Sequence, residues 1–398
     1  MAAHLNAGHL DHSDRVLRCG CGGQARYSGT RKKTFTTTLG PVTLVRAYYH
    51  CRDCAHGWYP KDRALGLERR TISPGVLRII GLTAGRVSFA ESRTLLRELA
   101  GLRVSVKQVE RSARRLGRQI DEDERTRMDR EPCEAKTRYL GLDGTGVPVR
   151  KSETAGRKGK QPDGSAKTRE MKLVAIWTAE QTHAKGGVHT DEGSTTYTAA
   201  IESAATLDHD PEPSIFAQRV EREARRRGFQ DAERQGVIAD GAWWIWNLCS
   251  ELFPDAVQIV DIYHAKEKIW EVARAVYGGE SDLTKKWAEQ RIQQLRAGDI
   301  ETLVEGIQSV SGVAPIAAQA VGYFQRNQPR MRYRRFREKN LCISSAVVEA
   351  GCKQVVGTRL KRGGMHWTVA GANEIVALRS CLLSRRFDDF WYATAINQ

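Results

Sequence analysis

The chain has 398 residues, 40% of them hydrophobic, which predicts about two to four domains with at least one sizeable core and excludes a wholly disordered protein. Its formal charge of +16 attracts polyanions, so nucleic acid is the first partner to expect. No stretch approaches the roughly 20 uncharged apolar residues that cross a bilayer, and the N-terminus lacks a signal-peptide pattern, so we expect a cytoplasmic protein.

The nine cysteines are unevenly distributed, and four of them form two close pairs, Cys19/Cys21 and Cys51/Cys54. Between the pairs, apolar and polar residues alternate around the turn sequence "TLGPVT", which predicts a β-hairpin. Thiol pairs that flank a hairpin are typical of a zinc ribbon. We therefore expect a structural Zn²⁺ site rather than free thiols.

The first thiol pair departs from the usual spacing of zinc ribbons. A single glycine separates Cys19 from Cys21, whereas most ribbons have two residues at this place. His50 or His56 is an alternative ligand if one cysteine is badly placed. The predicted zinc-ribbon-like domain spans residues 1–65.

Residues 73–119 have helical periodicity and are divided by glycines into three helices. The last two, joined by a turn and with Ser105 as a cap, are typical of a helix-turn-helix in a domain at 66–130. One face of the last helix carries the side chains expected to contact DNA, which are Lys107, Gln108, Arg111, Arg114, Arg115 and Arg118. The alternative is a solvated basic face on an ordinary helical hairpin.

A charged segment at 121–137 precedes a second pattern, in which strands alternate with helices. Strands are expected at 139–149, 171–177, 236–239 and 257–260, and helices at 215–227 and 243–252. This order indicates a mixed α/β sheet covered by helices. Residues 265–340 are expected to form a helical insertion, which divides the core into residues 137–264 and 341–398.

Several acidic residues follow apolar runs in this core. Asp143 in "YLGLDGTG" and Asp240 in "VIADGAWW" each end such a run and precede a glycine. Carboxylates that meet at one edge of a sheet are costly unless a cation neutralises them, so their convergence predicts a divalent metal. The alternative is that each Asp-Gly pair is only a turn. Asp261 in "VQIVDIYH" competes with Asp240 for the same role, and His264 shares its helix face.

Glu349 lies on a helix predicted at 344–356, where it either joins the acidic residues or only pairs with Lys353 one turn later. The run "RMRYRRFREK" places Arg334 and Arg335 between aromatic rings, a composition that serves phosphate contact and base stacking. An exposed helix face is the alternative. The tryptophans that follow Asp240 are expected to pack in the core, with one of them a candidate for DNA contact.

Taken together, these blocks resemble a known family. They are the cysteine hairpin with "TLGPVTLVRAYYHC", then "GLDGTGVP", "VIADGAWWIWNL", "QIVDIYHAKEKIW" and "VVEAGCKQVVGTRLKRGGMHW". In this order they resemble bacterial insertion-sequence transposases of the ISKra type, relatives of the Mutator superfamily, over residues 19–380. The resemblance implies a ribonuclease H-like core with an Asp, Asp, Glu triad, which maps onto Asp143, Asp240 and Glu349. Asp261 and His264 match a family signature, which makes Asp261 a supporting residue and His264 a further catalytic candidate.

The resemblance also implies a reaction and partners. The expected activity is DNA cleavage and strand transfer with two Mg²⁺ or Mn²⁺ ions held by the three carboxylates. The partners are the terminal inverted repeats and the target DNA, bound by a dimer or a larger assembly in a bacterial cytoplasm, at the nucleoid when bound to DNA. Two rival hypotheses remain: a DNA-binding regulator without catalysis, and a nuclease of the same fold that cuts DNA without joining it.

Overall fold

The computed structural model describes residues 2–7, 14–127, 129–131, 134–182, 188–205 and 213–396. It divides the chain into two compact units, Met1–Asp121 with Arg385–Gln398, and Glu122–Ser384. No helix in these ranges is both long and apolar enough to span a bilayer.

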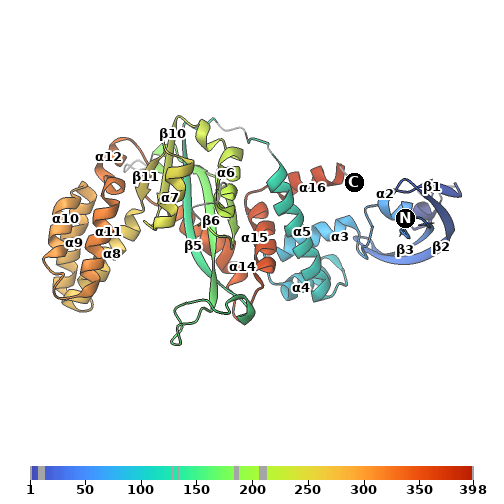
Figure 1. The fold of residues 1–398 in the computed structure, drawn as a ribbon, viewed down its shortest axis with the longest axis horizontal. Helices are drawn as coiled ribbons and strands as arrows, with labels where there is room; N and C mark the ends of the chain where they lie inside the picture. The colour runs from blue at the N-terminus through green and yellow to red at the C-terminus, as the bar shows by residue number, and fades with distance from the viewer. Residues whose placement is uncertain are drawn as a thin grey trace. The chain divides into compact units, whose positions relative to one another are not determined.

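The first unit begins with an antiparallel four-stranded sheet in the order β1-β2-β3-β4 (Figure 1). Its strands are β1 Val16–Arg18, β2 Gln24–Thr37, β3 Gly40–Cys51 and β4 Gly57–Trp58. The predicted hairpin is formed by β2 and β3, and Gly40 adopts the positive φ of 98° that their tight turn requires. Buried Ala25, Ala47 and Tyr49 pack beside two of the cysteines.

The helices of the first unit follow the sheet. They are α1 Ala2–Asn6, α2 Pro60–Ala64, α3 Pro74–Ala84, α4 Phe89–Ala100, α5 Val106–Thr126, which continues into the second unit, and α16 Phe387–Ile396. Ser88 caps α4 in a capping box, and Gly101 ends it in the left-handed conformation. The Ser105 side chain accepts a hydrogen bond from the amide of Gln108 at the start of α5. The three helices predicted within residues 73–119 are therefore present as α3, α4 and α5.

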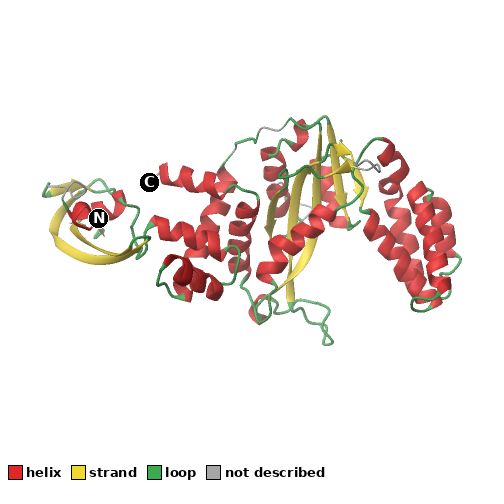
Figure 2. Ribbon diagram, turned by 180° about the vertical axis from the view of Figure 1, so that it is seen from behind, coloured by secondary structure: helices red, strands yellow, loops and turns green. Residues whose placement is uncertain are grey.

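The second unit is built on a mixed sheet, whose strands are yellow in Figure 2. It has five strands in the order β11-β10-β5-β6-β9. The strands are β5 Thr137–Pro148, β6 Thr168–Thr178, β9 Thr196–Ala200, β10 Arg234–Ala239 and β11 Val257–Val260, with a separate two-stranded ribbon of β7 Gln181–Thr182 and β8 Val188–His189. β5, β10 and β11 are parallel, whereas β6 is antiparallel to both β5 and β9. The mixed α/β fold expected from the sequence is confirmed.

Helices cover both faces of this sheet. The helices of this unit are α6 Ile215–Arg226, α7 Trp243–Leu252, α8 Ile262–Tyr277, α9 Asp282–Ala297, α10 Ile300–Gln308, α11 Pro315–Asn327, α12 Tyr333–Glu338, α13 Ala346–Gly351, α14 Thr358–Leu360 and α15 Val369–Leu383, with short 3-10 turns η1 Lys151–Glu153, η2 Phe229–Asp231 and η3 Gln328–Met331 and a π-helix η4 Cys352–Gly357. Of these, α8 to α11 pack against one another as a bundle beside the sheet (Figure 1). Lys172 on β6 lies over the ring of Phe216 on α6, while the next residue, Leu173, lies beside Gly351 of α13. Because successive strand residues face opposite ways, α6 and α13 lie on opposite faces.

Candidate functional site

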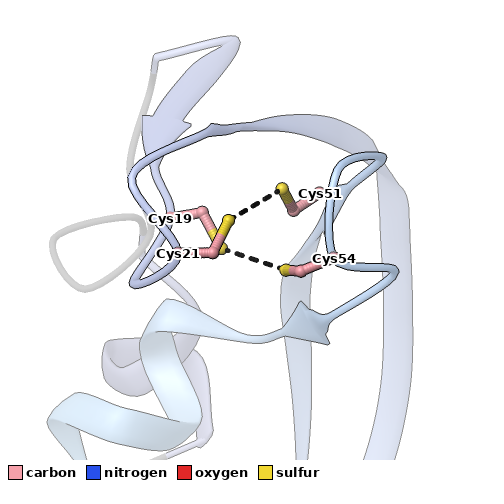
Figure 3. Close-up of side chains that lie close together, drawn as sticks. All are labelled: Cys19, Cys21, Cys51 and Cys54. Atoms are coloured by element: carbon pink, nitrogen blue, oxygen red, sulfur yellow. Dashed lines mark hydrogen bonds between the residues drawn. The ribbon is translucent and has the colours of Figure 1, made fainter.

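The four clustered cysteines come from two turns of the first sheet (Figure 3). Cys19 and Cys21 lie between β1 and β2, Cys51 ends β3, and Cys54 lies in the turn before β4. The Cys19 and Cys54 sulfurs are 3.6 Å apart, the Cys21 and Cys51 sulfurs are 3.7 Å apart, and all four lie within 4.8 Å of one another. These four are unbonded thiols.

The sulfur distances fit tetrahedral metal coordination. A Zn–S bond of about 2.3 Å gives an S···S edge of about 3.8 Å in a tetrahedron, close to both measured pairs. A backbone hydrogen bond from His56 lowers the pKa of the Cys54 thiol, but the neighbouring thiols outweigh it and raise the pKa to about 12. Four thiolates this close repel one another unless a cation lies between them. The cluster can therefore bind zinc, and neither histidine alternative is needed.

The one-residue spacer in the first pair has a local explanation. The Cys19 amide donates to the Gly23 carbonyl at 2.8 Å, and the Gly22 amide donates to the Cys19 carbonyl at 3.0 Å. Gly22 adopts a φ of 89°, which a side chain would disfavour. This tight turn brings both thiols to the same side in fewer residues than the usual knuckle.

The pairing of strands in the second sheet places three aspartates at the same position along adjacent strands. Ile238 on β10 is opposite Gly141 on β5, and Ala239 is opposite Val260 on β11. Continuing both registers along the strands places Asp240 level with Asp143 on one side and with Asp261 on the other.

Asp143 lies inside β5, opposite Leu173 of β6, so the turn interpretation is wrong for this residue. Burial raises the pKa of its carboxyl group, and the charge of Asp240 raises it further, although hydrogen bonds from Cys352 and Gly144 oppose the shift. In the described chain, Asp143 forms no ion pair with a lysine or arginine. A half-buried carboxylate beside a second one is the environment in which a bound cation has most effect.

Asp240 follows β10 and is half-buried. Its Oδ1 accepts a hydrogen bond from the Ala242 amide at 2.9 Å, so the turn interpretation is correct at this position, while its other carboxylate oxygen remains available. Its carbonyl accepts from the Tyr323 hydroxyl at 2.8 Å. Gly241 has a φ of 100°, and a Cβ there would lie 2.8 Å from the Tyr323 ring, so only glycine permits this approach.

Asp261 is buried and connects two helix starts. Its Oδ1 accepts from the amides of Tyr263 at 2.6 Å and His264 at 3.0 Å, which caps α8, and its Oδ2 accepts from the amide of Ser345, the cap residue of α13. Burial raises the pKa of Asp261, but the hydrogen bonds from His264 and Ser345 outweigh it and hold the pKa below its ordinary value. The Asp261 carboxylate, 3.7 Å from Nδ1 of His264, in turn raises the pKa of that imidazole.

Glu349 lies on α13, which packs against β5 and β6 and so brings this residue near Asp143. The approach depends on Gly141, because a Cβ there would lie only 2.0 Å from Cγ2 of Val348. The Glu349 side chain is 59% exposed and accepts a hydrogen bond from Lys353 at 2.6 Å, so the simple ion pair that the sequence allowed is present. Glycine inside a strand was the signal in the sequence for this close packing.

One open cleft of about 520 Å³ is lined by Asp143, Asp261, His264 and Glu349. Asp240 lies next to this cleft in the sheet but is not part of its wall. In the described chain, the cysteines are the sole group of three or more His, Cys, Asp or Glu residues whose ligand atoms all lie within 4.8 Å. The carboxylates are therefore neighbours, but their oxygens do not meet at a single point.

The basic face of α5 lines a pocket of about 500 Å³ in the first unit. Lys107, Arg111 and Arg115 are exposed along it, and Arg69 and Arg70 complete the wall. Burial lowers the pKa of Arg70, and the positive charge of Arg115 lowers it further. No carboxylate of the described residues lines the pocket, so this surface is built to attract anions.

Two of the other side chains on α5 that were predicted to contact DNA, Gln108 and Arg114, interact with neighbouring side chains of the protein. Gln108 donates from Nε2 to the Thr71 hydroxyl at 3.1 Å, and Arg114 lies 3.8 Å from Glu110. Arg118 is exposed on the same face. The two arginines before α3, Arg69 and Arg70, were not predicted, because nothing local in "LERRT" indicates that it folds against α5.

The family model described as "Uncharacterised protein family (UPF0236)" matches residues 9–371. The chain belongs to UPF0236. Among solved structures it is similar to the "Drosophila P element transposase strand transfer complex", at 12% identity and a TM-score of 0.28, with 85% of this chain and 84% of that chain covered. No match is found among curated proteins.

The prediction that Tyr333 and Phe336 stack on nucleic-acid bases is wrong for this UPF0236 chain. Tyr333 is fully buried and donates its hydroxyl to the Val260 carbonyl, and Phe336 is 7% exposed, so neither ring is available to stack on bases. Arg334 and Arg335 are exposed on the other face of α12, and Arg334 pairs with Glu338 at 3.0 Å.

The three tryptophans after Asp240 divide between core and surface. Trp246 is buried at 3% exposure, as predicted, but Trp243 is 64% exposed, with Arg326 over its ring at 5.4 Å. Trp244 lies edge-on to Phe216. Residues three apart lie on the same face of a helix, so the sequence pattern alone could not tell which of Trp243 and Trp246 is buried.

Proposed function

We propose that this protein is a DDE transposase of the ISKra type, with a ribonuclease H-like core, which binds the ends of an insertion sequence and catalyses metal-dependent DNA cleavage and strand transfer. The observation that carries the proposal is the alignment of Asp143 with Asp240 across adjacent parallel strands, with Glu349 lining the same cleft as Asp143. Carboxylates from separate strands and a helix suit a phosphoryl-transfer site with two metal ions.

The carboxylate oxygens of the acidic residues do not all lie within 4.8 Å of one another, which fits a pair of ions better than a single one. Asp143, Asp240 and Glu349 would together hold the ions. When bound, such ions activate the attacking oxygen and stabilise the leaving one.

Lys353 bonds only Oε1 of Glu349, so Glu349 can act as a ligand through Oε2, or through both oxygens once Lys353 is released. An exposed pair of this kind contributes only about 0.3–0.5 kcal/mol, so the release costs little. Asp261 accepts hydrogen bonds at both carboxylate oxygens, whereas Asp240 accepts one at Oδ1 from the Ala242 amide, which favours Asp240 as the ligand and Asp261 as the residue that positions α13. His264, with its raised pKa, is suited to contact a phosphate oxygen at the cleft.

DNA binding is assigned to the pocket on α5, where Lys107, Arg111 and Arg115 supply charge for phosphates. Arg334 and Arg335 on α12 offer a second basic surface for the backbone. The four-cysteine sheet would stabilise the first unit with zinc. Synapsis of two element ends would require at least a dimer.

The test uses purified protein, labelled DNA that includes the sequences flanking its own gene, and Mg²⁺ or Mn²⁺, with cleavage and joining scored on denaturing gels. We expect Asp143→Asn, Asp240→Asn and Glu349→Gln to abolish both steps. Glu221→Gln is the matched control, because Glu221 forms the same kind of i,i+4 pair, with Arg225 at 2.7 Å, away from the cleft. It should remain active.

The other outcomes separate the rival functions. Cleavage without joined products would indicate a nuclease, and DNA binding without any metal-dependent cleavage would indicate a regulator. Full activity of Asp240→Asn together with loss in Asp261→Asn would move the second ligand to Asp261.

A further inference from the structure

One wall of the acidic cleft is a single face of α8 that none of the carboxylate chemistry uses. The face consists of Tyr263, Lys266, Glu267, Trp270 and Arg274, all of which line the cleft. Their spacing of three, four, seven and eleven residues from Tyr263 places them along one side of the helix. We call this set the α8 face.

The α8 face pairs aromatic rings with cations. The Lys266 ammonium lies 4.9 Å from the centre of the Tyr263 ring, and the Arg274 guanidinium lies 5.7 Å from that of Trp270. Tyr263 is 62% exposed, and Trp270 is half-buried, so both present ring surface to the cleft. Open ring surface flanked by cations can bind a planar group that carries negative charge beside it.

The face itself carries two cations, Lys266 and Arg274, and it lies opposite the carboxylates Asp143, Asp261 and Glu349 of the same cleft. Burial lowers the pKa of Lys266, and the nearby cations Arg296 and Arg337 lower it as well, while Asp261 acts against them. Glu267 is the one carboxylate within the face itself. Cations crowded at this distance favour a polyanion, and open rings favour a planar apolar group. A nucleotide of an unpaired strand carries both.

We propose that the α8 face is a binding site for an unpaired DNA strand, on which Tyr263 and Trp270 each stack a nucleobase while Lys266 and Arg274 contact the phosphates. This inference rests on the proposed function and extends it, because it assigns an unpaired strand as the form of DNA that enters the acidic cleft.

The dimensions of the helix constrain how the strand binds. Seven residues along α8 separate the two rings by about 10 Å. Stacked nucleotides advance by about 3.4 Å each, so the rings cannot hold adjacent stacked bases. Each ring takes a separate base, about three nucleotides apart. Such bases must be unpaired, because a base in a duplex does not expose its face.

The test measures binding in EDTA, so that no cleavage takes place. The ligands are single-stranded oligonucleotides with 2-aminopurine, the same sequence as a duplex, and a single strand with abasic sites at the labelled region. We expect the single strand to bind more tightly than the abasic strand, with quenched 2-aminopurine fluorescence. Tyr263→Leu and Trp270→Leu should each weaken single-strand binding by roughly 5- to 100-fold. Trp270→Phe should retain most of the affinity and of the quenching.

Tyr392→Leu is the matched control, since Tyr392 is 61% exposed but lies on α16. It should bind like the wild type. Equal affinity of the abasic and the intact strand, or unchanged binding by both leucine variants, would overturn the inference. Cleavage by the wild-type protein is measured separately with Mg²⁺. If the wild type cleaves DNA but the leucine variants bind single strands as tightly as it does, only the role of the α8 face is refuted. If the wild type does not cleave DNA but the leucine variants bind single strands more weakly, only the transposase function is refuted.

Discussion

Asp261 holds the starts of α8 and α13 with one buried carboxylate, so its replacement by alanine should destabilise the second unit more than loss of an ordinary cap. Loss of the α8 cap at Tyr263 and His264 costs about 1 kcal/mol. Loss of the charged bond to the buried Ser345 amide costs about 1.5–3 kcal/mol more, and removal of the buried charge offsets part of this. We expect about 3 kcal/mol in total, or a decrease in Tm of roughly 6–12 °C.

The assay is thermal unfolding, together with hydrogen exchange of the amides in α8 and α13. Asp299→Ala is the control, because Asp299 caps α10 through a single bond to the Thr302 amide at 3.2 Å. It should lower Tm by only about 2–4 °C, from a loss of about 1 kcal/mol. An equal decrease in the two variants, or exchange that is faster in α8 alone, would refute the idea of a double cap.

The pH dependence gives the same test a second readout. The pKa of Asp261 is lowered by folding, so its contribution to stability is complete above its unfolded pKa, about 3.9, and is lost as the pH falls through the lower folded value. The stability difference between wild type and Asp261→Ala should therefore not shrink between about pH 8 and pH 5, because protonation of His264, whose pKa Asp261 raises, increases it there, and it should shrink below about pH 4. A difference that already shrinks between pH 7 and pH 5 would mean that folding raises this pKa.

Three further predictions follow from packing, metal binding and charge. Gly141→Ala should destabilise the second unit by about 1–3 kcal/mol in urea unfolding and reduce cleavage, since its Cβ would lie 2.0 Å from Val348. Gly312→Ala is the control, because Gly312 has open space around it, and it should change stability by less than about 1 kcal/mol. Equal effects of the two substitutions would contradict the packing of α13 on β5. Cys21→Ser should abolish stoichiometric zinc in metal analysis of the purified protein; one bound zinc per chain in this variant would exclude Cys21 as a ligand. Arg111→Ala should reduce the slope of log K against log salt for duplex DNA by about 0.9, while Arg225→Ala should not; an unchanged slope would remove Arg111 from the interface.

The sequence by itself determined the local elements. The serine cap at Ser105, the glycines between helices and the change from alternating to helical periodicity identified the hairpin and α3 to α7, because these signals act within a few residues. The two cysteine pairs also predicted a metal cluster, since a hairpin between them has few ways to close. β9, a short strand with the sequence "TYTAA", was missed because it has little apolar pattern.

Only the tertiary structure decided which distant residues meet. The alignment of Asp143 with Asp240 depends on the pairing of β5 with β10, in which Gly141 lies opposite Ile238 far along the chain, and no local pattern sets that register. The burial of Tyr333 beneath exposed arginines depends likewise on β11, whose carbonyl it reaches across 73 residues. Caps and turns are fixed by neighbours along the chain, whereas a site is fixed by packing between elements, and a single sequence carries the first kind of information far more directly than the second.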